Sequence, residues 1–359
     1  MKKKALIVSI AAIMTAIAAV VVLTSPYLWF DLSKADKSLP NFATAGLGVE
    51  NANGEGWYLV FSDEFEGSRL NSGEGLVSSV GTEIWTTSPH GLRKATSVKG
   101  DTEGLNSSYW CPSMVTLNDG KVEIRAEQRT DHMCEDGICP SAGIFTGGIE
   151  TRRIADADTS DGTASKGTND ELLFGQAFGY FEAYVRFPDG PGIWSAFWLQ
   201  SSNQRKMGNL GKDGTEIDIY ESAFVSKPSV TGHALLWNGY TSPRSISKGT
   251  TVDTGVSLYG AYHKFALKWT PDYYVFYVDD VPTWVSNDGG VSRVKEFLRL
   301  TVEVDEGDGW GPHGQIIGRF DPNFEYIFYV DYVKVYQNVH YAAYEKPDSY
   351  YKGDLNLFS

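Results

Sequence analysis

The stretch GTEIDIYES, residues 214–222, places Glu216, Asp218 and Glu221 among apolar residues. Side chains of a β-strand alternate between faces with a period of two, so Glu216 and Asp218 share one face and Glu221 points to the other. The apolar neighbours need a buried face, and acids inside a sheet are costly unless they have partners or a function. A β-bulge, one extra residue before Glu221, would return its side chain to the face of the other two.

With such a bulge, Glu216 and Glu221 are about four strand steps apart, or roughly 13 Å between backbone positions at about 3.3 Å per residue. If each side chain leans inward by about 4 Å, the carboxyl groups lie roughly 5 Å apart, the separation of a retaining glycosidase pair, whereas an inverting pair needs about 6.5–9.5 Å. Asp218, midway, could hydrogen-bond the nucleophile, and crowding raises at least one carboxyl pKa. The simpler interpretation is a solvated acidic strand edge, since E-x-D-x-x-E occurs by chance in about one chain in ten of this length.

Most of the chain after Trp57 alternates with a period of two and predicts β-strands. The turn sequences NDGK (118–121) and NDGG (287–290) follow the same pattern, and no helical period or internal repeat is evident. We therefore predict an all-β sandwich of two packed antiparallel sheets. The expected strands are WYLVFS (57–62), GKVEIRAE (120–127), GYFEAYVRF (179–187), GIWSAFWLQ (192–200), TEIDIYES (215–222), HKFALKWT (263–270), YYVFYVDD (273–280), FLRLTVEV (297–304) and FYVDYVKVY (328–336).

Composition excludes one class of partner and favours another. The chain has 359 residues and a formal net charge of −14, which argues against nucleic acid because phosphate binding needs Lys and Arg. Ten Trp and twenty Tyr exceed what a core of this size needs, so some of them are expected on a surface that stacks against flat ligand faces.

The N-terminus predicts export. MKKK precedes a charge-free run at residues 5–23, longer than the usual hydrophobic region of a signal peptide and nearly long enough to span a membrane. Residues 1–30 are predicted to be either a cleaved signal peptide or an uncleaved signal-anchor helix, followed by a linker at 31–54. The three lysines stay cytoplasmic in either case, so the remainder is expected to be extracellular, secreted or anchored to the outer face of the membrane.

Three cysteines, Cys111, Cys134 and Cys139, suit one disulfide and one remaining thiol in an exported protein. The pairing cannot be assigned from spacing. The segment DHMCEDGIC (131–139) also brings His132 close to two of them, but a structural zinc site needs four ligands, so a disulfide is favoured over a metal.

GTEIDIYES resembles the signature of glycoside hydrolase family 16, the laminarinase and lichenase-like endo-β-glucanases. GYFEAYVRFPDGPGIWSAFWLQ (179–200), FSDEF (61–65), FALKWTPDYYVFYVDD (265–280) and FYVDYVKVY (328–336) match its order of segments. The resemblance covers residues 57–337 and implies a catalytic domain at 55–338, followed by a tail at 339–359. It implies a β-jelly-roll sandwich, concanavalin A-like, whose concave sheet forms a cleft for a polysaccharide.

The resemblance also implies residue roles. Glu216 would be the nucleophile, Glu221 the acid/base and Asp218 the assisting carboxylate. Trp194 and Trp198 match cleft tryptophans, and alternation places them on one face, although core packing is the alternative. His233, in TGHALLWNGY (231–240), matches a position near the catalytic strand, with a structural role as the alternative.

Trp237 and Trp310 are weaker candidates for sugar stacking. Family members hold a structural Ca²⁺, for which the matching donors are the Asp331 carboxylate and the backbone oxygens of Glu64 and Gly120, an oxygen-only set that suits calcium.

The leading hypothesis is a monomeric retaining endo-glycosidase that cleaves β-1,3 or mixed β-1,3/1,4-glucan and needs no catalytic cofactor. FLRLTVEVDEGDGWGPHG (297–314) stands where many laminarin-type members carry an Asn-rich stretch, which leaves the glycan open. Alternatives are a hydrolase of agar-like galactan, a transglycosylase using the same residues, and a non-catalytic carbohydrate-binding protein, which would not need the two glutamates.

Overall fold

The computed structural model describes residues 56–71, 83–87, 108–131, 142–153, 171–201, 203–204, 209–221, 226–239, 245–304 and 318–346. The chain separates into two units, Met1–Asp36 and Lys37–Ser359, and every described residue belongs to the second. The run at 5–23, Cys134, Cys139 and Trp310 lie outside the described ranges, so export and disulfide pairing stay predictions. Within those ranges, no helix is long and apolar enough to cross a membrane.

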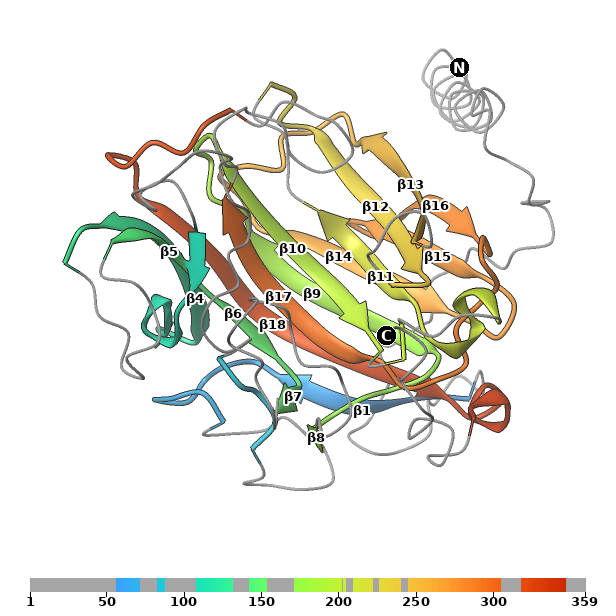
Figure 1. Ribbon diagram of the computed structural model, residues 1–359. Helices are drawn as coiled ribbons and strands as arrows, with labels where there is room; N and C mark the ends of the chain where they lie inside the picture. Colours follow the sequence, from blue (N-terminus) through green and yellow to red (C-terminus); the bar gives the residue numbers. More distant parts are fainter. Residues whose placement is uncertain are drawn as a thin grey trace, which may run out of the picture. The chain divides into compact units, whose positions relative to one another are not determined.

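The described strands form two large sheets and one short ribbon (Figure 1). The ten-stranded sheet has the order β16-β15-β14-β9-β18-β4-β5-β2, with β1 paired to β18 and β3 to β4. Its strands are β1 (Trp57–Asp63), β2 (Ser108–Trp110), β3 (Val115–Asn118), β4 (Lys121–Arg129), β5 (Gly143–Thr146), β9 (Gly179–Arg186), β14 (His263–Trp269), β15 (Tyr274–Val278), β16 (Val281–Ser286) and β18 (Tyr326–Asn338).

The six-stranded sheet has the order β13-β12-β11-β10-β17-β6 and carries the acidic stretch near its middle. Its strands are β6 (Gly148–Glu150), β10 (Ile193–Gln200), β11 (Glu216–Glu221), β12 (Val230–Trp237), β13 (Ile246–Asp253) and β17 (Phe297–Val304). The ribbon pairs β7 (Arg152–Arg153) with β8 (Glu171–Leu172), and the short 3-10 helices are η1 (Pro112–Met114), η2 (Leu210–Asp213) and η4 (Ala342–Tyr344).

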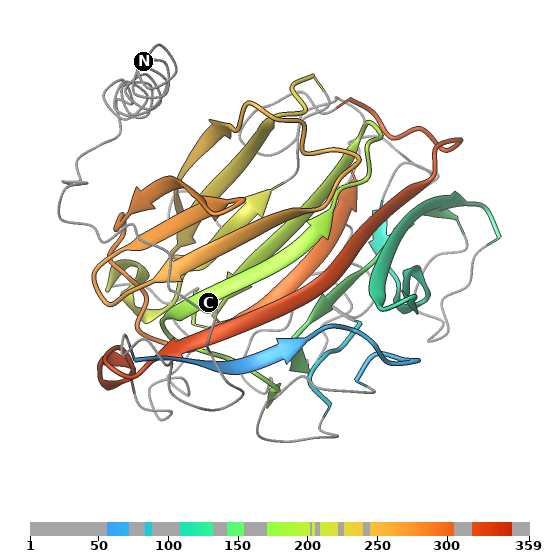
Figure 2. The ribbon, with the colours of Figure 1, turned by 180° about the vertical axis from the view of Figure 1, so that it is seen from behind.

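The two sheets pack face to face as a jelly-roll sandwich, which confirms the predicted fold. Figure 1 shows β10, β11 and β17 in front of β9, β14 and β18, and the order reverses in Figure 2. Alternate residues of both layers, such as Phe181 of β9 and Phe197 of β10, are fully buried in one cluster. Tyr220 of β11 lies against Phe265 of β14 with ring centroids 4.3 Å apart, so the acidic strand is attached to the core through its apolar face.

All nine strands expected from alternation are present, and others were missed. Neither β12 nor β13 was predicted; β13 is mostly exposed and polar, so it has no apolar alternation to detect. One pairing departs from the antiparallel prediction, because β2 and β5 run parallel. The NDGK turn joins β3 to β4 with positive φ at Asp119 and Gly120, the conformation that a two-residue hairpin requires.

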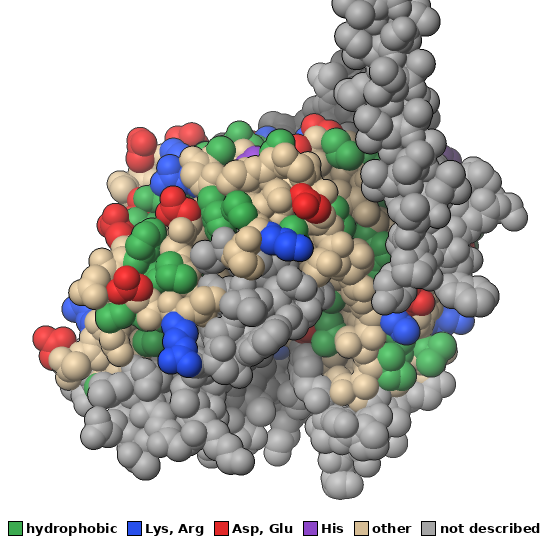
Figure 3. Space-filling model, turned by 90° about the horizontal axis from the view of Figure 1, so that it is seen from above, with side chains coloured by type: hydrophobic (Ala, Val, Ile, Leu, Met, Phe, Trp, Pro, Cys, Tyr) green, Lys and Arg blue, Asp and Glu red, His purple; other side chains and the backbone are tan. Residues whose placement is uncertain are grey.

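The surface has no single charged face in the view of Figure 3, where acidic and basic side chains are interspersed among other residues. On the described residues of this face, the negative charges that make up the net charge of −14 are not gathered into one acidic patch that a polycation could bind.

One acid is buried between the ends of two strands. Glu296, immediately before β17, is 0% exposed, and its Oε1 accepts a hydrogen bond from the N–H of Thr215, next to β11, at 3.1 Å. Burial raises the pKa of Glu296 to about 8 from an ordinary value of 4.5. This carboxyl group therefore holds a proton in the folded protein at neutral pH.

We predict that Glu296 makes the free energy of unfolding fall with rising pH. The folded state binds a proton that the unfolded state releases between pH 4.5 and about 8, so stability is lost across that window and levels off above it. In thermal unfolding, the Tm of Glu296→Gln minus the Tm of the wild type should increase as pH rises through this window. Glu325→Gln, at an exposed position, is the matched control; equal pH slopes in all three proteins would contradict the assignment.

Candidate active site

The three acids of β11 lie on one face because the strand carries a bulge. On β10, Ala196 pairs with Glu221 and Trp198 pairs with Asp218. A single residue separates the two positions on β10, whereas Ile219 and Tyr220 separate them on β11. The pairing with β12 shows the same irregularity between Asp218 and Glu221. The predicted bulge is confirmed.

His233 of β12 holds the bulge from behind. Its Nδ1 lies 2.6 Å from the Ile219 carbonyl oxygen, and because a carbonyl only accepts, Nδ1 carries the proton and donates. Its Nε2 lies 2.9 Å from Oγ1 of Thr283, which belongs to β16 of the other sheet. The extra residue in β11 would otherwise have an unpaired buried carbonyl, so this contact offsets a cost that bulges carry.

The acids line a pocket of about 390 Å³ on the outer face of the six-stranded sheet. Glu216 and Glu221 are each 8% exposed, and Asp218 is 5% exposed. Five neighbouring strands supply the walls, as expected for a site built on a rigid sheet. The lining residues are Trp194, Ala196, Trp198, Glu216, Asp218, Glu221, Ala234, Leu236, Ser247, Lys248, Gly249, Thr301 and Glu303.

The pKa of Asp218 is strongly perturbed by its surroundings. Burial raises its pKa well above the usual range, and repulsion from Glu221, Glu216 and Glu303 adds to the effect, while Arg299 opposes it. Asp218 therefore holds a proton in conditions that ionise an ordinary Asp, and a protonated carboxyl can donate a hydrogen bond to a neighbouring carboxylate.

Sequence reasoning missed the contribution of β17 to this site. Arg299, Thr301 and Glu303 lie at a period of two within FLRLTVEV, and their register opposite Trp198, Ala196 and Trp194 places them on the pocket side. Thr301 accepts a hydrogen bond from the Trp198 indole N–H at 3.0 Å. The polar alternation in this strand was the available signal.

Trp194 and Trp198 line the pocket, on the face that alternation predicts. His233 and Trp237 do not: they share the other face of β12 with Leu235 and are 0% and 4% exposed. Trp237 belongs to the core and packs so closely against Gly289 that a Cβ there would come within 2.7 Å of its indole ring. These two residues therefore support the site by packing and by holding the bulge, instead of by stacking on a sugar.

Of the predicted calcium donors, Asp331 is in β18, Glu64 directly follows β1, and Gly120 is in the turn between β3 and β4. Burial raises the pKa of Asp331, and Glu64 and Glu66 raise it further by repulsion, against Lys121 and Lys334. Glu66 also lies beside Gly120, within 3.3 Å of the position of an added Cβ. One carboxylate and two backbone oxygens suit a hard cation, although no group of three acidic, His or Cys side chains that could hold a metal occurs among the described residues.

Comparisons with known proteins point to one family. Residues 143–304, which include every strand that lines the pocket, match the model of glycosyl hydrolases family 16. Endo-1,3-1,4-beta-glycanase EglC of Rhizobium meliloti is 25% identical over 323 residues, covering 86% of this chain and 63% of that protein. Beta-glucanase of Rhodothermus marinus is 25% identical over 170 residues, covering 45% of this chain and 57% of that protein.

The fold has matching solved structures. The laminarinase catalytic domain of Thermotoga maritima superposes with a TM-score of 0.53 at 23% identity, covering 79% of this chain and 100% of that domain. The chain spans less than two thirds of the length of the two curated relatives. Over residues 143–304, which carry the pocket, this chain is similar to glycosyl hydrolases family 16.

The His233 contact generates a prediction. His233→Ala leaves the Ile219 carbonyl buried without its partner, which should cost about 1–3 kcal/mol of unfolding free energy. Because the bulge then relaxes, the register of Glu221 should become less well defined, and urea unfolding together with a glycan-binding titration would measure both effects. His340→Ala, at an exposed position just beyond the end of β18, is the control. Unchanged stability in His233→Ala would show that the histidine does not hold the bulge.

Proposed function

We propose that this protein is an endo-acting glycoside hydrolase that cleaves β-1,3 or mixed β-1,3/1,4-glucan with retention of anomeric configuration. The observation that carries the proposal is the bulge in β11, which brings Glu216, Asp218 and Glu221 onto one wall of a pocket. A carbohydrate-binding protein on the same fold has no need of three clustered carboxyl groups, which are costly to bury.

The reaction has two steps. Glu216, as carboxylate, attacks the anomeric carbon while Glu221 donates its proton to the glycosidic oxygen, so the sugar–oxygen bond breaks and a glycosyl ester forms on Glu216. Water then enters, Glu221 removes its proton, and the hydroxide attacks the same carbon and releases Glu216. Protons and electrons balance over the cycle, and the net change is hydrolysis of one glycosidic bond.

Asp218 assists from between the two glutamates. Its raised pKa keeps a proton available for donation to a carboxylate beside it, and this donation favours the ionised form of the acceptor. As the ester forms, the acceptor loses its charge and Asp218 can retain its own proton. The ionised Glu216 thus avoids facing a permanent negative charge on Asp218.

The glycan class rests on the relatives and on the pocket walls. The two curated relatives are named for β-glucan or β-glycan cleavage, and the pocket offers the side chains of Trp194 and Trp198 for stacking. A transglycosylase would use the same acids and transfer the ester to a sugar hydroxyl in place of water. The charge-free run at residues 5–23 supports a location outside the cytoplasm, where such polymers occur.

We also propose that Asp331, with the backbone oxygens of Glu64 and Gly120, holds a structural Ca²⁺. The cation would neutralise the repulsion that Glu64 and Glu66 exert on Asp331. At these donors the cation would lie beside the ten-stranded sheet, so it would support the fold and take no part in the chemistry.

Activity is tested by reducing-sugar release from laminarin, lichenan, xyloglucan, agarose and carrageenan. We expect the full-length chain to cleave a β-glucan, and Glu216→Ala to show no release because the nucleophile is gone. Glu221→Ala should lose about 10²–10⁴-fold, the usual contribution of an acid/base group. Glu325→Ala is the control, and product analysis with added oligosaccharide separates hydrolysis from transfer.

Added azide distinguishes the two roles. In Glu221→Ala, azide attacks the glycosyl ester from the face that water uses and yields the β-glycosyl azide; in Glu216→Ala, it enters from the nucleophile's side and yields the α-anomer. Exchanged anomers would reverse the assignment. A wild-type protein that binds a glycan and cleaves none would favour the binding-protein alternative.

For the cation, we expect Ca²⁺ to raise the Tm of the wild type relative to EDTA-treated protein, because a ligand of the folded state alone stabilises it. Asp331→Asn should lose that increase. Asp253→Asn, on the exposed edge strand β13, should keep it. The same Ca²⁺ response in all three proteins would exclude Asp331 as a ligand.

A further inference from the structure

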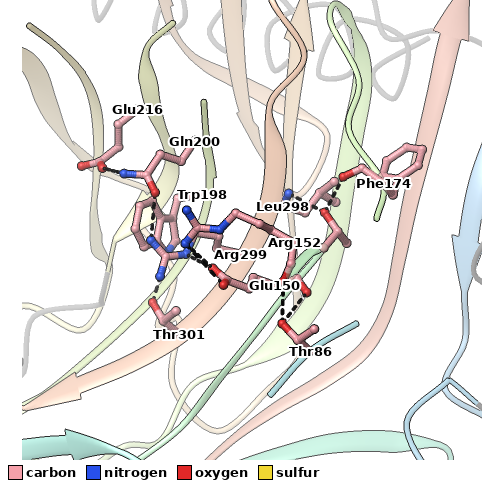
Figure 4. A network of polar contacts seen from close by, with 11 residues as sticks. Thr86, Glu150, Arg152, Phe174, Trp198, Gln200, Glu216, Leu298, Arg299 and Thr301 are labelled. Carbon is pink, nitrogen blue, oxygen red and sulfur yellow. Dashed lines mark hydrogen bonds and ion pairs between the residues drawn. The ribbon is translucent and has the colours of Figure 1, made fainter. Parts of the chain in front are cut away.

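A chain of polar contacts leads from the buried Glu150 to the Glu216 carboxyl group (Figure 4). Oε2 of Glu150 lies 3.0 Å from Nε of Arg299. Arg299 donates through Nη1 to Oε1 of Gln200 at 3.1 Å, and Gln200 donates through Nε2 to Oε2 of Glu216 at 3.2 Å. The four side chains are between 0% and 8% exposed, so water competes little for these contacts.

Arg299 determines which way the Gln200 amide points. An amide group can place either its oxygen or its nitrogen toward a given neighbour. A guanidinium only donates, so the end that faces Arg299 must be the oxygen, and the NH₂ end is directed at Glu216. An ionised Glu216 only accepts, so both ends of the amide agree with a single orientation.

The guanidinium is itself fixed from several sides. Its carbon lies 3.9 Å from the centroid of the Trp198 ring and 5.4 Å from that of Trp110. The ion pair with Glu150 holds its Nε edge, and the rigid planar fork of Arg loses little further freedom in such a setting. The aromatic wall of the pocket and the orientation of Gln200 are thus coupled through one side chain.

We propose that Gln200 is a positioning residue for the nucleophile Glu216, held in its donating orientation by the Glu150–Arg299 pair. The inference rests on the proposed function of Glu216. Donation from the amide favours the carboxylate form and restricts the carboxyl group to one rotation. A carboxylate fixed in this way needs no reorientation before it attacks, and that is where positioning lowers a barrier.

Other charged groups act on Glu216 as well, and the test must separate Gln200 from them. Those on the packed elements are Asp218 and Glu221 on β11, Arg299 and Glu303 on β17, Glu150 on β6, Lys248 on β13, and Glu296 before β17. All of them remain in place when only Gln200 is changed.

The experiment compares Gln200→Leu and Gln200→Glu with the wild type on two substrates: the glucan that the wild type cleaves, and a dinitrophenyl β-glycoside of the same sugar. The dinitrophenolate leaves without a proton, so its release in the first turnover, measured as a pre-steady-state burst, depends on Glu216 and does not need Glu221. Glu221→Ala is the reference for a defect confined to the acid.

We expect kcat of Gln200→Leu to fall about 10–100-fold on both substrates with KM changed little, because a misplaced nucleophile slows its own step. Glu221→Ala should keep the first-turnover burst on the aryl glycoside and lose activity on the glucan, whereas Gln200→Leu should slow both. Gln200→Glu keeps an acceptor for Arg299 and can donate to Glu216 only when the introduced carboxyl is protonated. As pH rises, the introduced carboxyl of Gln200→Glu loses its proton and can no longer donate. The fall in rate on the basic side of its pH–rate profile should therefore occur at lower pH than in the wild type, a shift that Gln200→Leu does not show.

Three outcomes overturn the inference: wild-type kcat in both Gln200 variants, a Gln200→Leu defect on the glucan alone, or identical pH profiles for Gln200→Glu and the wild type. If Gln200→Leu unfolds, the isosteric Gln200→Glu decides. A wild-type protein inactive on every glucan and on the aryl glycoside would instead refute the proposed function, so the two failures are distinguishable.

Discussion

On β11 two residues, Ile219 and Tyr220, occupy the length that Phe197 alone occupies on β10, and the pocket depends on this mismatch. In a regular strand Glu221 would point into the core, because a shift of one residue moves a side chain to the opposite face. The extra residue is stabilised from the core side by His233, which reaches through Thr283 to the other sheet. The position of the acids is therefore set by the packing of the whole sandwich.

The same wall concentrates negative charge, and the surroundings limit its cost. Four carboxyl groups line the pocket, and the pKa of Asp218 rises in response to burial and to the other three. Beside them Arg299 and Arg152 share Glu150, all three buried, so this group of three has a net positive charge next to the negative pocket. Hydrogen-bonded, paired charges can be buried in this way, whereas an isolated one could not.

Strand alternation predicted correctly which face most site residues lie on, but it did not predict which residues of other strands contact them. The acids at 216, 218 and 221 and the alternation of Trp194 with Trp198 predicted one wall of the pocket, because strand periodicity is local information. The face that His233 presents depends on β12, a strand that was not recognised, so the sequence could offer a structural role for it only as an alternative. Arg299 and Gln200 lie 99 positions apart in the chain, and only the sheet order makes them neighbours.

The walls of the pocket differ in how firmly they are held. β11 has a bonded strand on each side, whereas among the described strands β13 pairs with β12 alone, and most of its residues are exposed. Ser247, Lys248 and Gly249 of β13 nevertheless line the pocket. The site thus combines a stiff floor, which carries the acids, with a compliant rim. Related chains could adapt to polymers of different width by altering this rim strand, while the geometry of the reacting groups is preserved.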